Sequence, residues 1–225
     1  MKKISIIIPT LNEEKQIERC LASVRALHSR GHEIIVVDGG SEDETCSQVK
    51  DLADKIIPHS RGRATQMNVG AHAACGEIFI FLHADTCLPD DADTYINDEL
   101  NEDIEFWGRF NVRLSGRHWL FRIIEICMNM RTRITGIVTG DHAIFMSKTL
   151  YNNVGGFPEI ALMEDIAISS KLKHIVHPVC LKQSVVTSSR RWEENGIIKT
   201  ILKMWWLRLA FFLGSDPLTL ARQYD

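Results

Sequence analysis

The chain has 225 residues, of which 45% are hydrophobic and 24% are charged. This composition is typical of a globular protein that buries a core of its own, as one large domain or as a domain with a tail. The formal net charge of −3 provides no basic field for nucleic acid, so we expect no nucleic-acid partner.

The six cysteines are scattered, and none has the Cys-x-x-Cys spacing or another metal-binding spacing. We expect reduced, mostly buried thiols of a cytoplasmic protein. The apolar run near the start is too short for a signal peptide, because polar residues follow from Thr10. No uncharged apolar run of 18 residues occurs, so the sequence predicts no simple transmembrane helix.

The first third of the chain alternates short apolar runs with helical patterns. Residues 5–9 are β-branched and end in proline, and apolar residues at helical spacing follow over 17–27. Residues 33–38 and 55–58 predict two more strands, and the small residues of 61–76 predict a helix packed closely on the sheet. This rhythm indicates βαβ units and a mostly parallel sheet flanked by helices, an α/β fold.

A capping box is expected after the second strand. Ser41 and Glu44 have the required spacing, and Gly39-Gly40 before them forms a turn. We therefore expect a second helix to open at Ser41.

The strand predicted at residues 78–82 is the one around which the site is organised. This run is short, apolar and β-branched or aromatic, and it stops abruptly at His83-Ala84-Asp85. Open α/β sheets bind ligands at the carboxyl ends of their strands, so Asp85 suits a divalent metal through its hard oxygen atoms. The alternative is that Asp85 only caps the next turn.

The pattern changes after about residue 105. Strands are expected at 106–114 and 142–147, and helices at 119–133 and from 163 to 172. We interpret residues 1–195 as one α/β domain whose second half binds the acceptor.

Three aspartates fall at predicted strand ends or helix starts, namely Asp38, Asp85 and Asp165. A nucleotide diphosphate needs a ribose or base contact, a cation on its pyrophosphate and a base that activates an incoming hydroxyl. Asp38 suits the first task, Asp85 the second and Asp165 the third. Turn capping by Asp38 and stabilisation of a helix N-terminus by Glu164 and Asp165 remain open as structural alternatives.

At this point the residues match a family. The chain resembles the family 2 glycosyltransferases with a GT-A fold over about residues 3–192. The motifs that carry this resemblance are IPTLNEE at 8–14, VDGGS-x-D at 37–43, Arg63 with Asn68-x-Gly70, HAD at 83–85, VGGF at 154–157 followed by Glu164-Asp165, and Arg191-Trp192. The resemblance implies inverting transfer of a sugar from a nucleotide sugar, usually with Mn²⁺ or Mg²⁺.

The resemblance also implies roles for individual residues. The nucleotide-binding positions are Pro9, Thr10, Asn12, Glu13, Asp38, Arg63 and Asn68. The metal positions are Asp85 and His83, the general base is Asp165, and the acceptor-binding positions are Glu164, Arg191 and Trp192. Asp141 is a further acceptor-binding candidate because of its position before the strand expected at 142–147, with a turn carboxylate as the alternative.

The sequence departs from the family pattern at two positions. His83 replaces the first aspartate of the metal motif, and it is either a ligand or a hydrogen-bonded core residue. Ser188 replaces the glutamine that often precedes Arg-Trp, which argues against a processive polymerase.

Two other classes stay open beside the glycosyltransferase. A nucleotidyltransferase would need a glycine-rich basic phosphate loop, whereas residues 10–14 are acidic. A non-catalytic, membrane-associated module that binds nucleotide sugars would not need all three aspartates. The absence of GxGxxG and of a P-loop motif disfavours hydride transfer and P-loop chemistry.

Residues 196–225 are predicted as an apolar helical tail. The ten apolar-rich residues 204–213 are too few to span a bilayer, but tryptophans beside lysines and an arginine are typical of an interfacial helix. The alternatives are a helix buried against the domain or in a dimer. We expect a peripheral position at the inner membrane face, which suits a lipid-linked acceptor.

Overall fold

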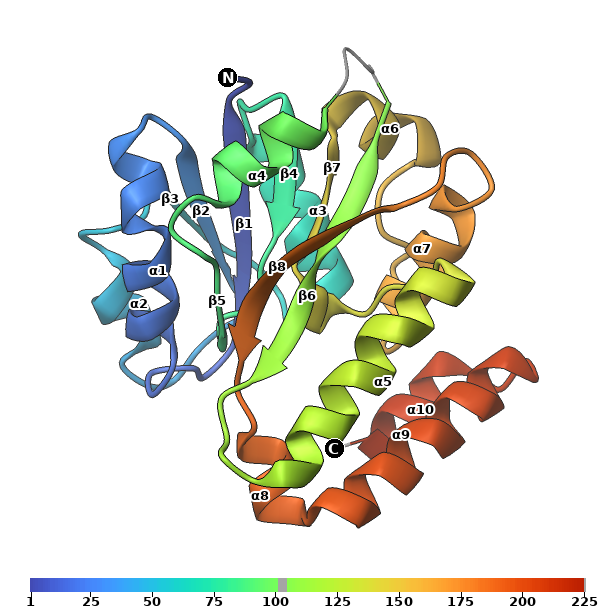
Figure 1. Cartoon of the computed structure of the whole chain (residues 1–225). Helices are drawn as coiled ribbons and strands as arrows, with labels where there is room; N and C mark the ends of the chain where they lie inside the picture. Colours follow the sequence, from blue (N-terminus) through green and yellow to red (C-terminus); the bar gives the residue numbers. More distant parts are fainter. Residues whose placement is uncertain (101–104, 225) are drawn as a thin grey trace.

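The computed structural model describes residues 1–100 and 105–224. In this part of the chain an eight-stranded sheet is flanked by helices, and the predicted α/β architecture is confirmed (Figure 1). The strands are β1 (Ile4–Thr10), β2 (Glu33–Asp38), β3 (Lys55–Pro58), β4 (Ile78–Phe81), β5 (Thr86–Cys87), β6 (Trp107–Leu114), β7 (Ile144–Ser147) and β8 (Val179–Thr187). The α-helices are α1 (Ile17–Ser29), α2 (Thr45–Val49), α3 (Arg63–Ala73), α4 (Ala92–Glu99), α5 (Trp119–Thr135), α6 (Lys148–Val154), α7 (Glu164–Leu172), α8 (Arg190–Asn195), α9 (Ile197–Phe212) and α10 (Pro217–Tyr224).

The strand order is β3-β2-β1-β4-β7-β6-β8-β5. Strands β3, β2, β1 and β4 are parallel, so their carboxyl ends meet at the lower edge of the sheet in Figure 1. The register pairs Thr10 with Asp38 at that edge. Strand β7 then pairs antiparallel with β4 and β6, which begins the second half of the sheet.

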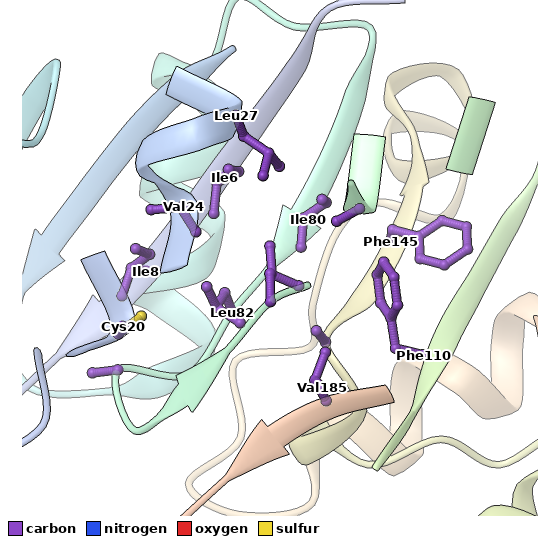
Figure 2. Close-up of a cluster of buried hydrophobic side chains, with 14 of the residues drawn as sticks. Ile6, Ile8, Cys20, Val24, Leu27, Ile80, Leu82, Phe110, Phe145 and Val185 are labelled. Atoms are coloured by element: carbon purple, nitrogen blue, oxygen red, sulfur yellow. The ribbon is translucent and has the colours of Figure 1, made fainter. Parts of the chain in front are cut away.

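The core forms on both faces of the sheet because its central strands are buried on both sides. Figure 2 shows Ile6 and Ile8 of β1 pointing toward Val24 of α1, and Phe110 beside Phe145 farther along the sheet. The residue between the two isoleucines, Ile7, belongs to the cluster on the opposite face. The alternation of side chains along a strand therefore divides one apolar run between two cores.

Helix α3 packs on that opposite face at very close range. A Cβ atom added at Gly70 would lie 2.4 Å from Cγ2 of Ile7. The small residues of 61–76 thus have the physical role that the sequence predicted, since any side chain at Gly70 would displace the helix from the sheet.

Three expectations are wrong. Helix α2 begins at Thr45 rather than at a capping box, because Ser41 uses its hydroxyl to bind Asp38. The expected strand at 142–147 begins only at Ile144, since residues 140–142 form a 3₁₀ turn. The free cysteines are not mostly buried: Cys20 is buried, but two are exposed and three are intermediate.

The C-terminal helices pack against the second half of the domain. Leu207 and Ala210 of α9 and Leu220 of α10 are buried in a cluster with Ile137 and Ile166. The predicted boundary between the domain and the tail at residue 195 therefore stays a prediction. Asp225, the last residue of the predicted tail, lies outside the described residues. No helix in the described ranges has the length and apolar character needed to cross a membrane.

Candidate active site

The ends of β1 and β2 form the first part of the site. Thr10 and Asp38 are both buried, and the Thr10 hydroxyl lies 3.3 Å from an Asp38 carboxylate oxygen. Asp38 also accepts hydrogen bonds from the amides of Gly40 and Ser41 at 2.9 Å and from the Ser41 hydroxyl at 2.5 Å. Burial alone would raise the pKa of Asp38, but these donors lower it, so the carboxylate is ionised and holds the turn in place.

The loop after β1 is fixed to the loop after β2. Asn12 has a positive φ of 53°, its amide donates to the Ser41 hydroxyl, and its side-chain oxygen accepts from the Glu42 amide. The amide of Glu13 donates to the Thr45 hydroxyl at 2.8 Å. The two loops therefore form one rigid rim at the carboxyl edge of the sheet.

Gln66 of α3 reinforces this rim, and sequence reasoning missed it. Its side-chain amide is buried and donates to the carbonyl oxygens of Thr10 at 2.9 Å and Val37 at 2.8 Å. A lone glutamine in a helix of small residues carries no pattern that identifies such a contact from the sequence.

Glu13 and Asp85 are neighbours across the rim. Burial and the nearby Asp85 charge raise the pKa of Glu13, while Arg190 opposes this effect from 3.5 Å. Asp85 accepts a hydrogen bond from the hydroxyl of the adjacent Thr86 at 3.2 Å. Two carboxylates with one partial counter-charge leave net negative charge here, which suits a cation.

Glu13 has a basic partner in Arg190, which sequence reasoning did not single out. Arg191 instead stacks on the ring of Tyr224, with 3.9 Å from the guanidinium carbon to the ring centroid. Trp192 is only partly buried and packs against the main core. The register of the short helix α8 therefore decides which arginine reaches the rim, and the acceptor-binding roles of Arg191 and Trp192 stay predictions.

His83 lies against the 3₁₀ turn of residues 140–142. Its Nδ1 is 3.6 Å from Oδ1 of Asp141, and a Cβ atom added at Gly140 would lie 2.2 Å from its Nε2. Desolvation would raise the pKa of Asp141, but His83 lowers it below its ordinary value. Only glycine at position 140 allows the imidazole to approach the backbone this closely.

Asp165 lies on the other side of the same turn. Its Oδ2 accepts from the Gly140 amide at 2.8 Å, and its Oδ1 accepts from the Ile166 amide at 2.7 Å. A cavity of about 10 Å³, about the volume that one water molecule needs, borders these groups. The residues lining it are Met67, Phe81, His83, Gly140, Ile144, Phe157, Glu164 and Asp165. The fold thus brings His83 and Asp165, which are 82 positions apart in the sequence, onto one cavity.

Glu164 is almost fully buried, and its carboxylate lies 3.3 Å from the Arg63 guanidinium. Burial raises the pKa of Glu164 and Asp165 adds to this effect, while Arg63 opposes it. Desolvation lowers the pKa of Arg63, but the nearby Glu164 charge raises it, and the net shift is upward. The pair joins the start of α3 to the start of α7, so it couples the two sides of the site.

Asn68 has all its side-chain hydrogen bonds directed to the protein. Its amide donates to the Phe157 carbonyl, and its oxygen accepts from the Phe157 amide and the Tyr151 hydroxyl, at 2.8–2.9 Å. A side chain at Gly156 would collide with that oxygen. These contacts connect the Asn68-x-Gly70 and VGGF motifs, which lie 89 residues apart.

The residues present fit a divalent ion that a ligand helps to hold. No group of three or more histidines, cysteines, aspartates or glutamates is close enough to bind a metal among residues 1–100 and 105–224. Mg²⁺ and similar ions are commonly bound by one or two protein groups together with substrate phosphates. Asp85, with or without His83, therefore suits a metal that shares its coordination with a diphosphate.

Comparisons with known proteins agree with this geometry. The model of the family described as Glycosyl transferase family 2 matches residues 5–151. The poly-beta-1,6-N-acetyl-D-glucosamine synthase of Staphylococcus epidermidis is 25% identical over 186 residues, which cover 75% of this chain and 45% of that protein. The chain thus spans about half the length of this curated relative.

Solved structures share the fold, which confirms the predicted GT-A architecture. TarS of S. aureus in complex with UDP-GlcNAc has a TM-score of 0.66 at 21% identity, covering 83% of this chain and 58% of that one. The mannosyltransferase PcManGT from Pyrobaculum calidifontis, in complex with GDP-Man and Mn2+, also has a TM-score of 0.66 at 21% identity. That likeness covers 99% of this chain and 69% of the mannosyltransferase.

Proposed function

Because the chain belongs to glycosyl transferase family 2 and is a glycosyltransferase, we propose that it transfers a sugar from a UDP- or GDP-linked donor to a hydroxyl acceptor with inversion. The acceptor oxygen attacks the anomeric carbon, the bond from that carbon to the diphosphate breaks, and the acceptor proton passes to Asp165. The observation that carries this proposal is the single cavity lined by His83, Gly140 and Asp165 at the carboxyl edge of the sheet.

The donor would lie along the rim formed after β1 and β2. Thr10 and Asp38 lie at the ends of paired strands, where α/β sheets bind nucleotides, and Glu13 connects them to Asp85. Asp85, together with His83, would hold Mn²⁺ or Mg²⁺, which supplies positive charge to the leaving diphosphate. Relatives of the fold have been solved with UDP-GlcNAc and with GDP-Man and Mn2+, which supports both donor classes and a divalent ion.

Asp165 suits the role of general base because two backbone amides orient its carboxylate. An oriented carboxylate that is half-exposed can accept a proton from a hydroxyl placed at the cavity. Glu164 and Asp141 flank it and would contact the acceptor, and Arg190 enters this proposal in place of Arg191.

A thermal-shift panel separates this function from the two alternatives. UDP and GDP, each with and without Mn²⁺, are compared with UTP and GTP. A ligand at 100 times its Kd stabilises by about 2.7 kcal/mol, which raises the Tm of a chain of this size by about 5–10 °C. We expect that shift for one diphosphate and only with Mn²⁺. A preference for a triphosphate would favour a nucleotidyltransferase. A separate assay of sugar transfer from each donor that binds distinguishes the enzyme from a binding module, which would transfer none.

We also propose that the protein docks on an anionic membrane surface. The supporting observation is an exposed apolar face on α5 and α9, which lie close together at the lower right of Figure 1. Its residues are Trp119, Ile123, Ile126, Met130 and Ile134 of α5, Ile198, Leu202, Trp205, Trp206, Leu209 and Phe212 of α9, and Leu213 directly after α9. Exposed cations on or next to the same helices, Arg117, Arg133 and Lys199, suit an anionic bilayer.

Flotation with liposomes that contain phosphatidylglycerol tests the docking. Truncation at Asn195 is unsuitable because it would remove the buried Leu207 from its cluster. The double variant Trp205→Gln/Trp206→Gln changes two side chains that are 68% and 60% exposed. The parental protein and the control Ile175→Gln, exposed outside this face, should float while the double variant stays at the bottom. A parental protein that does not float would contradict the proposal.

A further inference from the structure

Two arginines from different helices converge beside the candidate base. Arg131 of α5 and Arg208 of α9 are half-buried and interact electrostatically with each other and with Asp141 and Asp165. Burial lowers the pKa of both, and the neighbouring guanidinium adds to this effect at Arg131. Two cations are thus held near each other inside the protein.

Asp141 and Asp165 act on both arginines electrostatically, but no ion pair joins either arginine to a carboxylate in the described part of the chain. The Nε atoms of both are buried without a hydrogen-bond acceptor in the described ranges. Arg131 reaches only the Thr139 hydroxyl at 3.4 Å, whereas the nearby Arg63 has its own carboxylate in Glu164. A guanidinium that is desolvated without a partner is costly, so the arrangement favours an anion that both side chains can share.

We propose that Arg131 and Arg208 together bind a phosphate group of the acceptor. Guanidinium groups match phosphate oxygens in a bidentate geometry that lysine does not reproduce. The position favours the acceptor over the donor, because the charge of Asp165 acts on both arginines and α9 packs in one apolar cluster with Ile166 of α7. The donor rim lies at the ends of β1 and β2, and its carboxylate Glu13 is paired with Arg190. This inference rests on the proposed function of Asp165.

The C-terminal helix α10 completes the surroundings of the pair. Tyr224 stacks on Arg191, and its carbonyl accepts from Lys203 of α9 at 2.9 Å. Helix α9 is therefore fixed at the position that holds Arg208 near Arg131.

The phosphate has two possible sources, a lipid headgroup or a free phosphorylated molecule. The structure connects the site to the first source, since α5 and α9 carry the exposed apolar face as well as the two arginines. A headgroup phosphate at the bilayer surface would then lie next to both guanidinium groups.

Calorimetry with inorganic phosphate tests the site directly. The titration is made with UDP or GDP and Mn²⁺ at saturation, so that the donor rim is already filled. Hydrogen bonds to charged groups contribute about 1.5–3 kcal/mol each, so Arg131→Gln and Arg208→Gln should weaken phosphate binding by about 10- to 100-fold. The control Arg25→Gln removes an exposed arginine of α1, away from both helices, and should bind phosphate as the parental protein does.

Thermal unfolding without phosphate adds a second readout. Removing a buried cation that has no partner should leave the Tm unchanged or higher, whereas removing a structural counter-ion of Asp165 should lower it. Parental phosphate affinity in Arg131→Gln and Arg208→Gln, or no phosphate binding by the parental protein, overturns the proposal. If the parental protein bound neither UDP nor GDP, the proposed function would be overturned instead.

Vesicles identify the source. Phosphatidylcholine vesicles are doped with phosphatidic acid, a phosphomonoester, or with phosphatidylglycerol at equal charge. Stronger flotation with phosphatidic acid that Arg208→Gln loses and Arg25→Gln keeps identifies a lipid phosphate. A response to inorganic phosphate without that preference identifies a soluble acceptor. Flotation and phosphate binding that both survive Arg208→Gln contradict the site.

Discussion

The buried charges in the parallel half of the sheet have different surroundings from those in the region of the helices α5, α7 and α9. In the parallel half Glu33 is paired with Lys55, and Asp93 with Arg30 and His32. In the helical region Arg131 and Arg208 keep buried nitrogens without acceptors, and large apolar side chains face solvent. The first region is satisfied by its own residues, whereas the second has the charge and the surface of a region that binds something else.

The largest expected effect is on the base. Asp165→Asn removes the proton acceptor but can keep the contact with the Gly140 amide, so the fold should remain intact. We expect kcat to fall by about 10²-fold or more, the usual scale of positioned general-base catalysis, with unchanged donor binding. Steady-state kinetics with a matched donor measure this, and transfer at the parental rate would mean that Asp165 only orders the start of α7.

The next effect concerns the contact between His83 and Gly140. In Gly140→Ala the new Cβ would lie 2.2 Å from the imidazole, so the ring or the turn must move. We expect activity to fall by about 10- to 100-fold, because small displacements at a catalytic site have effects of that size. The control Gly155→Ala has open space for a Cβ but a positive φ, so it should lose stability while keeping activity. Equal activities of the two variants would contradict a role of His83 in the active site.

Asn68 tests whether the α3 contact is structural. Asn68→Ala leaves both backbone groups of Phe157 and the Tyr151 hydroxyl without their partner. Unsatisfied buried groups cost about 1–3 kcal/mol each, so the loss of three partners should lower the free energy of unfolding by about 3 kcal/mol or more in urea titrations. The exposed Asn152→Ala on α6 should change it little. If the variant kept full stability but lost nucleotide binding, the result would support the nucleotide-binding role that the resemblance predicts for Asn68.

The smallest effect is a pH dependence of the paired region. Burial opposes the ionisation of Glu33, but Lys55, Ser5 and Cys75 lower its pKa from 4.5 to about 2. A lowered pKa stabilises the fold above the unfolded value, and this contribution is lost as the pH falls from 4.5 toward 2. Glu33→Gln should therefore reduce stability by about 2–3 kcal/mol at pH 7 and flatten the acid transition, unlike the exposed Glu42→Gln. Parallel acid curves for parent and variant would contradict the assignment.

The sequence predicted the parallel half well because its signals are local. Strands β1, β2 and β4 are short apolar runs, and the carboxylates that follow them lie at the predicted edge. Strand β8 was missed because Lys182, Gln183 and Ser184 interrupt its apolar residues, and its pairing with β6 is a long-range contact. The sequence pattern alone does not show which distant strand pairs with such a segment.

The same distinction explains the site. Asp85 and Asp165 carry motifs, whereas Gln66 and Arg190 act through contacts that only packing determines. Arg208 lies in an apolar helix, where the sequence could suggest only that it is paired or extends toward solvent. The finding that its Nε is buried without an acceptor needed the position of α9.

The most direct test of the account is calorimetry of UDP and GDP binding, with and without Mn²⁺, to the parental protein, Asp85→Asn and Asp165→Asn. The account predicts that one diphosphate binds the parental protein and Asp165→Asn with the same Mn²⁺-dependent affinity. Asp85→Asn should lose that dependence while keeping its Tm, because it lacks the charged oxygen ligand at the end of the parallel half. Unchanged Mn²⁺-dependent affinity in Asp85→Asn would contradict the metal site, and no binding of either diphosphate would contradict the donor site itself.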